Sequence, residues 1–539
     1  MDRERYEQGS IALVNGRVFT ADEGRPWASA VGIWRGVIAY VGDDPDEARA
    51  AAGADAEVID LAGRTATPGL IDAHTHPMFY GEQLLGLDLT VPTSVKEILG
   101  LIRERASSTP TSEPIVGWGY YQLSLRENRL PTLAELDATA PDHPVVLTHR
   151  SGHEMIVNSA ALRLAGVTRD TVDPGGGYFQ RDEQGELTGA LIENAMRAMR
   201  VLEREPGPEQ WDARLRRVTQ QFLRYGITST ADANVTSADA MHSYLRVQDD
   251  PTSPRMRFNL MLGHWQMLDP GEALGLMTGF GNRWVRAGAM KFFLDGTEGM
   301  RTAKLSEPFA DDPGNTGMWM FPPEEFRERV MRAHLAGWQC ATHAIGDAAI
   351  ELTLDAYRDA HERLPRRDSR HRIEHASLMR PDLVDRMARE GVLPIPGSRF
   401  ASNDYPVLIE RFGQERLRWY QPWSSWMERN VPVAASSDAP VQTPDPAKSL
   451  KAIVTSRAEH ARDLTMQPEE TLALEEALIA YTRNAAFASH EENRKGMLRP
   501  GMLGDVTVFN TDIFALDPLE LDTIRAVVTV VDGVVVCEY

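Results

Sequence analysis

The sequence has few cysteines and no long apolar run. Its 539 residues include two cysteines, Cys340 and Cys537. Two thiols exclude a framework of disulfides, so a reducing compartment, the cytoplasm, is the expected location. No stretch approaches the roughly 18 consecutive apolar residues of a membrane-spanning helix, and the charged start MDRERYEQGS lacks the apolar core of a secretory signal. We therefore expect no membrane partner.

Positive charge is also scarce. Asp and Glu number 78 against 57 Lys and Arg, and the formal charge is −21 at pH 7. This balance favours solubility and argues against a nucleic-acid partner, because phosphates attract basic surfaces. Hydrophobic residues make up 42% of the chain and charged residues 25%. These proportions are typical of a soluble globular protein.

Short β patterns occur at both ends of the chain. IALVNGRVFT turns at Asn-Gly (15–16), and AVVTVVDGVVVCEY turns at Asp-Gly (532–533). Both dipeptides are preferred in tight hairpin turns. Two independent hairpins are the alternative, but isolated hairpins are marginal in water. We expect one composite β-sandwich built from residues 1–67 and 496–539.

The central residues alternate short apolar strand patterns with longer amphipathic helix patterns. Eight strands are expected, at residues 69–76, 226–232, 257–262, 288–295, 339–344, 372–377, 391–396 and 431–438. The helix patterns have ordinary boundaries, such as Pro381 at the start of PDLVDRMARE and Gly391 after it. The expected fold class is α/β, with eight βα units closed into a (β/α)₈ TIM barrel over residues 68–495.

The connection between the first two strands is far longer than an ordinary βα loop. It contains the strand patterns EPIVGWGY and PVVLTHR and the glycine-rich turn DPGGGYF. This regular patterning argues against a structureless loop. We expect residues 80–205 to form an inserted α/β subdomain beside the mouth of the barrel, as a wall or a lid.

Polar residues gather at the carboxyl ends of the expected strands, where barrels place their active sites. His74 and His76 point the same way because side chains alternate across a strand. Such a pair is either a bidentate metal site or two hydrogen-bonded core histidines. His343, His375 and Asp438 end three further strands, and this shared placement favours a metal site.

A lysine lies in the fourth strand, where Lys291, Phe293 and Asp295 share one face. A buried charge needs a partner, so one interpretation is an ion pair with Asp295. In the other, burial favours the neutral amine, which can add carbon dioxide to become a carbamate that bridges two divalent ions. Mixed imidazole and oxygen ligands favour zinc, and other divalent ions are possible.

The order H-x-H, Lys, His, His, Asp along these strands resembles the amidohydrolase superfamily of metal-dependent hydrolases. Segments along essentially the whole chain are similar to the amidohydrolase 3 family, which includes YtcJ-like proteins and N-substituted formamide deformylases. These segments are TPGLIDAHTHP, GWGY, VVLTHRSGHEMIVNSAAL, KFFLDGTEGMRTA, ATHAIGDAAI, RIEHAS, SSDAPV, LEEALIAYTRNAA and RKGMLRPGMLGDVTVFN. The resemblance implies the barrel, the sandwich and a carboxylated lysine at Lys291.

The resemblance also implies a set of metal ligands: His74, His76, Lys291, His343, His375 and Asp438. The H-x-H pair and Asp438 would hold one ion, the other two histidines a second, and carboxylated Lys291 would bridge them. Metal-bound water reaches a pKa near 7, and the resulting hydroxide attacks a carbonyl carbon. Asp438 is then the general base and later the general acid. In the alternative, one ion is bound and Lys291 is only a structural charge.

Weaker candidates lie around this set. His153 matches a family histidine that contacts the substrate oxygen, and a surface role is the alternative. Trp118 and Tyr120 of GWGY would line an apolar pocket or pack in the core. Asp295 would orient a ligand or anchor the following loop. Glu374 alternates to the opposite face from the neighbouring histidine, so we expect it outside the metal site.

The resemblance implies hydrolysis of a C–N bond in a small amide, formamide or cyclic amide. Ile395-Pro396 stands where many family members have Gln-Pro, and YYQLSLRENRLPT departs from the common pattern, so formamide specificity does not carry over directly. The alternative is a deaminase, or a lyase or isomerase with the same metal centre. A non-catalytic scaffold is disfavoured because every ligand position is filled. A homodimer is compatible with such barrels.

Overall fold

The computed structural model describes residues 9–202, 206–263, 267–459 and 461–538. The start of the predicted range 1–67, the end of the predicted insertion (203–205) and the last residue of the range 496–539 lie outside the described residues. Over the described part of the chain, no helix has the length and apolar character needed to cross a bilayer.

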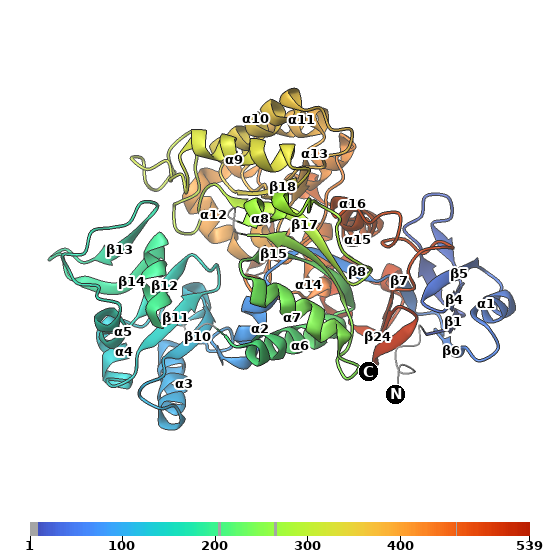
Figure 1. Ribbon diagram of the computed structural model, residues 1–539, viewed down its shortest axis with the longest axis horizontal. Coiled ribbons are helices and arrows are strands. Elements are labelled where there is room, and N and C mark those ends of the chain that lie inside the picture. The colour runs from blue at the N-terminus through green and yellow to red at the C-terminus, as the bar shows by residue number, and fades with distance from the viewer. Residues whose placement is uncertain (1–8, 203–205, 264–266, 460, 539) are drawn as a thin grey trace.

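A parallel sheet lies between the sheet of the inserted segment and the sheets formed by the two ends of the chain (Figure 1). Its strand order is β20-β19-β18-β17-β16-β15-β8, with the bounds β8 Leu70–Thr75, β15 Ile227–Val235, β16 Arg257–Leu262, β17 Val285–Phe293, β18 Gln339–Ala344, β19 Arg372–His375 and β20 Leu393–Ile395. All neighbouring strands in this sheet are parallel. The seven strands coincide with the first seven expected from apolar runs, as buried parallel strands should.

The eighth expected strand, 431–438, closes the ring without forming a regular strand. On one side, the Ala434 N–H donates to a carbonyl of β20 (3.3 Å), and on the other the Asp438 N–H donates to the carbonyl of His74 (2.9 Å). Pro432 has no N–H to contribute to a ladder. The segment therefore bonds to both edges of the sheet and completes the TIM barrel.

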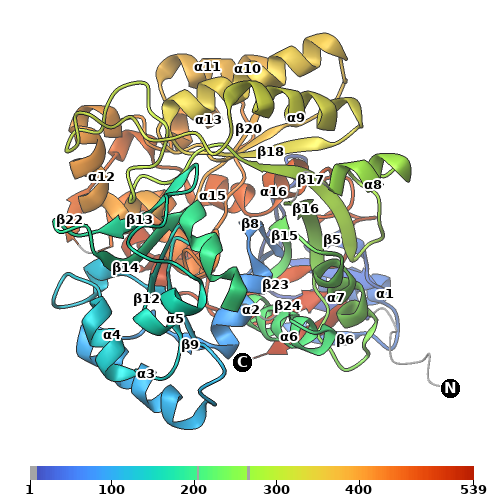
Figure 2. The same ribbon diagram turned by 60° about the vertical axis from the view of Figure 1, so that its left-hand side comes forward.

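Helices cover the outer face of the barrel (Figures 1 and 2). They are α6 Pro208–Arg224, α7 Ala238–Asp249, α8 Leu268–Ala273, α9 Pro323–Leu335, α10 Asp347–Arg363, α11 Pro381–Glu390, α12 Phe400–Leu417, α13 Trp423–Glu428, α14 Pro446–Thr455, α15 Leu474–Ala480 and α16 Arg483–Ala488. In α6 the residues Leu215, Val218 and Phe222 are fully buried, which is the apolar stripe of an amphipathic helix. Gly391 ends α11 in the left-handed conformation (φ 67°), as its sequence predicts.

The long connection after β8 forms its own sheet on one side of the barrel (Figure 1). Its strand order is β13-β14-β12-β11-β10-β9, with bounds β9 Leu87–Asp88, β10 Ile115–Tyr120, β11 Val145–His149, β12 Glu154–Val157, β13 Gly177–Arg181 and β14 Leu187–Glu193. The helices are α2 Pro77–Leu85, α3 Val95–Ser108, α4 Leu133–Thr139 and α5 Ser159–Leu164. Ile98, Ile102, Leu136 and Leu147 share a core with this sheet, so the connection is a packed unit.

Two sheets on the other side of the barrel combine both ends of the chain. One has the order β5-β4-β1-β6, with β1 Ile11–Val14, β4 Ala30–Trp34, β5 Val37–Gly42, β6 Glu57–Asp60 and the helix α1 Pro45–Ala52. The other has the order β25-β24-β23-β7-β2-β3, with β2 Arg17–Phe19, β3 Trp27–Ala28, β7 Thr65–Pro68, β23 Val506–Phe509, β24 Ala526–Val531 and β25 Val534–Glu538. Ile33 and Val508 belong to one core shared by the two sheets.

A buried arginine joins the barrel to this terminal sandwich. Arg257, the first residue of β16, is 1% exposed. Its guanidinium donates to both carboxylate oxygens of Asp505 (2.6 and 2.7 Å) and to Asp532 (3.2 Å). Asp505 precedes β23 and Asp532 lies in the turn after β24. The planar guanidinium presents two N–H donors to the Asp505 carboxylate, which makes the contact strong and fixes its geometry.

Replacing Arg257 with alanine removes the paired cation of the buried Asp505 carboxylate, whereas Asp532 keeps its ion pair with Arg283. We expect Arg257→Ala to lower the free energy of unfolding by about 3–5 kcal/mol, measured by denaturant unfolding. The matched control is Arg389→Ala, which removes a surface ion pair whose arginine side chain is 67% exposed, and its effect should stay within about 0.5 kcal/mol. Equal stability of the two variants would contradict the proposed joint.

Candidate metal centre

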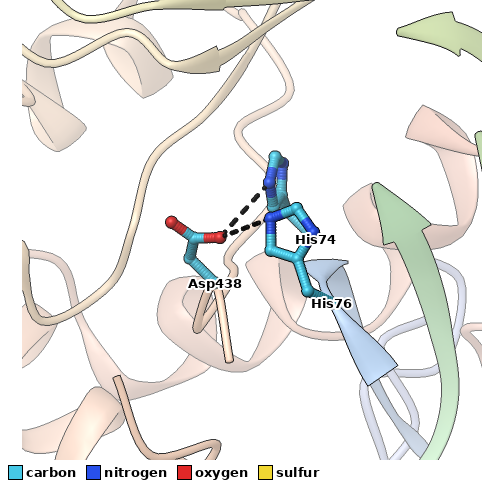
Figure 3. A group of neighbouring side chains, drawn as sticks. All are labelled: His74, His76 and Asp438. Carbon is cyan, nitrogen blue, oxygen red and sulfur yellow. Dashed lines mark ion pairs between the residues drawn. The ribbon is translucent and has the colours of Figure 1, made fainter. Parts of the chain in front are cut away.

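Three metal-binding side chains meet where β8 ends (Figure 3). The Asp438 Oδ1 atom lies 3.4 Å from His74 Nε2 and 3.2 Å from His76 Nε2. One ligand atom from each residue lies within 4.8 Å of the others. The backbone bond from Asp438 to His74 at the barrel seam holds this spacing. Imidazole and carboxylate groups at such separations suit a divalent ion.

Two further histidines extend the group across the barrel mouth. The ring of His375 lies 5.0 Å from that of His74 and 4.6 Å from that of His343, centroid to centroid. His375 Nδ1 is 3.9 Å from Asp438 Oδ2. Burial lowers the pKa of His343 and of His375 well below the usual value, so both rings are neutral. Neutral imidazole is the form that binds a metal.

Lys291 is 1% exposed on β17. Its Nζ has no hydrogen-bond partner among the described residues and lies 4.6 Å from the centre of the Phe293 ring. The alternative partner, Asp295, instead accepts hydrogen bonds from three backbone N–H groups of the loops after β17 and β18 (2.8–3.1 Å). Burial lowers the pKa of Lys291 to about 8, so the neutral amine is accessible.

The polar atoms of this group fit a bound metal. Several buried atoms have no hydrogen-bond partner among the described residues: His74 Nε2, His375 Nδ1, Lys291 Nζ and Asp438 Oδ1. Burial raises the pKa of Asp438, but His74 and His76 outweigh it and hold that pKa well below its usual value. Buried polar atoms are normally satisfied, and a divalent ion would satisfy these.

Glu374 belongs to the site, and the expectation that it points away is wrong. Its Oε2 contacts His74 Nδ1, while Arg372 donates to both of its oxygens (2.5 and 2.8 Å). Strand alternation fails here because His375 has φ 70°, a left-handed conformation that turns the chain at the end of β19. The Arg-x-Glu spacing, which pairs two charges on one strand face, is the sequence signal for this role.

Glu374 fixes the orientation of His74. A carboxylate on Nδ1 leaves Nε2 of the same ring facing Asp438, and partners of this kind orient metal-binding histidines. Burial raises the pKa of Glu374, but Arg372 and His74 lower it by a larger amount. The net pKa therefore lies below the usual range. Glu374 is therefore an anion at neutral pH.

The inserted unit brings His153 to the barrel mouth. The ring of His153 lies 5.7 Å from that of His343. His153 Nδ1 is hydrogen-bonded to Glu193 Oε2 (2.8 Å), and Glu193 Oε1 accepts from Thr302 Oγ1 (2.7 Å). Burial lowers the pKa of His153, but Glu193 outweighs it and the net shift is upward. The side chain is 19% exposed, so one face of the ring remains accessible.

The two aromatic candidates of GWGY have different surroundings. Tyr120 is fully buried, with its ring 5.3 Å from His149, and its hydroxyl has no hydrogen-bond partner within the described part of the chain. Trp118 lies parallel to Phe79, with ring centroids 6.1 Å apart. Phe79 is 5.9 Å from the His76 ring. Sequence periodicity does not single out Phe79, because an aromatic residue on a short helix is ordinary.

A TIM barrel with histidines and an aspartate gathered at its strand ends defines the class of metal-dependent hydrolases. Residues 57–537 match the model of the amidohydrolase family, and the chain belongs to this family.

Individual relatives align with this chain over nearly their whole length. The YtcJ protein of Bacillus subtilis (strain 168) is 31% identical over 490 residues, which cover 90% of this chain and 91% of that protein. The N-substituted formamide deformylase of Arthrobacter pascens is 30% identical over 539 residues, 97% of each chain. The crystal structure of an uncharacterized metal-dependent hydrolase from Pyrococcus horikoshii OT3 has 26% identity and a TM-score of 0.76, and covers 95% of this chain and 98% of that chain.

Removing the charge on Glu374 should weaken metal binding. We expect Glu374→Gln to bind metal about 10–100-fold more weakly, because an amide holds His74 less firmly than a carboxylate does. Competition with a chromophoric chelator measures this affinity. Glu362→Gln, at a side chain 70% exposed on α10, is the control and should match the wild type. An unchanged affinity in Glu374→Gln would show that the contact does not orient the ligand.

Proposed function

We propose that this protein hydrolyses a C–N bond in a small amide, formamide or cyclic amide. The convergence of His74, His76, His343, His375 and Asp438 at one barrel mouth supports the proposal most directly. Similarity to a formamide deformylase along nearly the whole of both chains supports the same bond class. Ile395-Pro396, in place of the Gln-Pro found in many family members, leaves the acyl group open.

One or two divalent ions, zinc by preference, are the proposed cofactor. His74, His76 and Asp438 would hold one ion, and His343 and His375 the other. When bound, such ions lower the pKa of water and polarise a carbonyl group.

Lys291 would complete the ligand set as a carbamate. Its neutral amine nitrogen forms a bond to the carbon of carbon dioxide, one C=O π bond breaks to give an anionic oxygen, and the nitrogen releases one proton to solvent. Two observations support this interpretation. The buried Nζ has no hydrogen-bond partner among the described residues, and Asp295 bonds to backbone N–H groups and not to Lys291. A carbamate satisfies that position without leaving an isolated buried ammonium.

Two side chains of this protein would handle the proton and the developing charge. The Asp438 carboxylate faces the centre and accepts a proton as water adds to the carbonyl carbon, then delivers it to the departing nitrogen. His153 is held through Nδ1 by Glu193, which leaves its other ring nitrogen, Nε2, available to a ligand. A proton on that nitrogen donates a hydrogen bond to the carbonyl oxygen, whose negative charge grows during the addition.

A panel of N-formyl, N-acyl and cyclic amides tests the proposed reaction. The metal-loaded protein should release an amine and a carboxylate, or open a ring, with uptake of one water per turnover, as measured by mass spectrometry in ¹⁸O-labelled water. Ammonia from a ring amine would assign a deaminase instead. Product formed without incorporated oxygen would assign a lyase or isomerase and refute hydrolysis.

His153 offers a test that leaves the ligand set untouched. We expect His153→Asn to lower kcat/KM by about 10²–10³-fold, because the oxyanion loses its donor, while the metal content stays that of the wild type. The control His242→Asn changes an exposed histidine of α7 and should retain full activity. Full activity in both variants would assign His153 a structural role.

Mass analysis tests the carbamate separately. Under native conditions at neutral pH, a peptide or intact chain containing Lys291 should be heavier by one carbon dioxide, and acid should remove this mass. Lys291→Ala should lack the added mass and bind fewer ions than the wild type, whereas Lys96→Ala, at an exposed lysine, should retain both. A wild-type chain of unmodified mass with its full metal content would refute the carbamate.

A further inference from the structure

Two aromatic rings lie parallel beside the metal centre. Phe79, on α2, and Trp118, on β10 of the inserted sheet, have ring planes 4° apart and centroids separated by 6.1 Å. We call these two residues the aromatic pair. Phe79 is 41% exposed, so its ring presents apolar surface beside the site.

The aromatic pair spans the distance between two sides of the site. At one end, the Phe79 ring is 5.9 Å from the ring of His76. At the other end, a Cβ at Gly152 would lie 3.4 Å from the Trp118 ring. Gly152 precedes His153, whose ring is 5.7 Å from His343. The aromatic pair therefore forms a wall from one metal-binding histidine to the turn that carries the proposed oxyanion donor.

Core packing does not account for the pair. Met78 and Tyr80, the neighbours of Phe79 on α2, are 7% and 6% exposed and belong to the barrel core. Neither member of the pair is part of a hydrophobic cluster among the described residues. The indole Nε1 of Trp118 is buried and has no hydrogen-bond partner there. Accessible aromatic surface next to a catalytic centre is typical of a ligand-binding wall.

We propose that the aromatic pair binds a planar aromatic ring of the substrate and so determines the substrate class as aryl-bearing amides. This inference rests on the proposed function. Flat rings stack on a parallel pair in offset or edge-on arrangements that a puckered saturated ring cannot adopt. A ring held against the wall places its attached amide toward His76 and the remaining ligands, because the wall begins at that histidine.

Binding of benzamide and cyclohexanecarboxamide, measured by calorimetry on the metal-loaded protein, tests the proposal. The saturated ring has at least as much apolar area, so burial alone does not favour benzamide. We expect the wild type to bind benzamide about 3–10-fold more tightly, the range that one or two aromatic contacts give. Phe79→Leu and Trp118→Leu should each bring the ratio of affinities toward one.

Two variants elsewhere on the surface are matched controls. Phe280→Leu and Trp34→Leu make the same substitutions at side chains 63% and 51% exposed, and both should keep the wild-type ratio. Equal affinity for the two amides in the wild type, no binding of either, or a ratio unchanged in both aromatic-pair variants would overturn the proposal. Hydrolysis is measured apart from binding, so a ring preference without turnover would refute the proposed reaction alone.

Discussion

The buried pair of Arg372 and Glu374 is the interaction on which the metal centre depends. The two side chains are 1% and 0% exposed, so their charges have lost water and must be compensated by each other and by nearby polar groups. The Arg372 Nη2 group, which donates to Glu374 Oε2, also donates to the carbonyl of Ala73 (2.7 Å). The pair thereby joins β19 to β8, and Glu374 turns His74 toward Asp438. One interaction supports both the barrel and the ligand geometry.

Barrel and insertion contribute different parts of the site. The barrel supplies all the predicted metal ligands, from its strands, from His76 just after β8 and from the segment 431–438 that closes the ring. The inserted unit supplies His153, whose ring lies 5.7 Å from that of His343, and Trp118, whose ring is parallel to that of Phe79. The predicted ligand set lies on the barrel and the proposed substrate contacts come largely from the added unit, so the same centre can serve different substrates when the added unit changes.

Much of this architecture can be predicted from the sequence, for identifiable reasons. Seven barrel strands are short apolar runs, and the H-x-H spacing follows from alternation across a strand. The eighth segment has the right position, but Pro432 and the left-handed backbone of Asp438 (φ 58°) prevent a regular ladder. Glu374 is misplaced by alternation because His375 turns the chain. Local dihedral angles of this kind leave little trace in hydrophobic patterning.

The role of Phe79 cannot be predicted from the sequence, for a different reason. Its role depends on being parallel to Trp118, which is distant in sequence and belongs to another sheet. Periodicity reports which face of a helix is buried, but not which exposed ring meets a ring from elsewhere. Contacts between separately folded parts of the chain require the three-dimensional arrangement.

The terminal sandwich can be completed only near the end of synthesis. In its larger sheet, β23 pairs with β7, and β24 and β25 extend it outward, so strands from residue 506 onward cover an edge formed before residue 69. A ribosome releases the first strands long before the last ones. Until then, β7 has one open edge, and open strand edges recruit other chains. The edge of β7 that β23 covers therefore stays unpaired until the whole barrel has been synthesised.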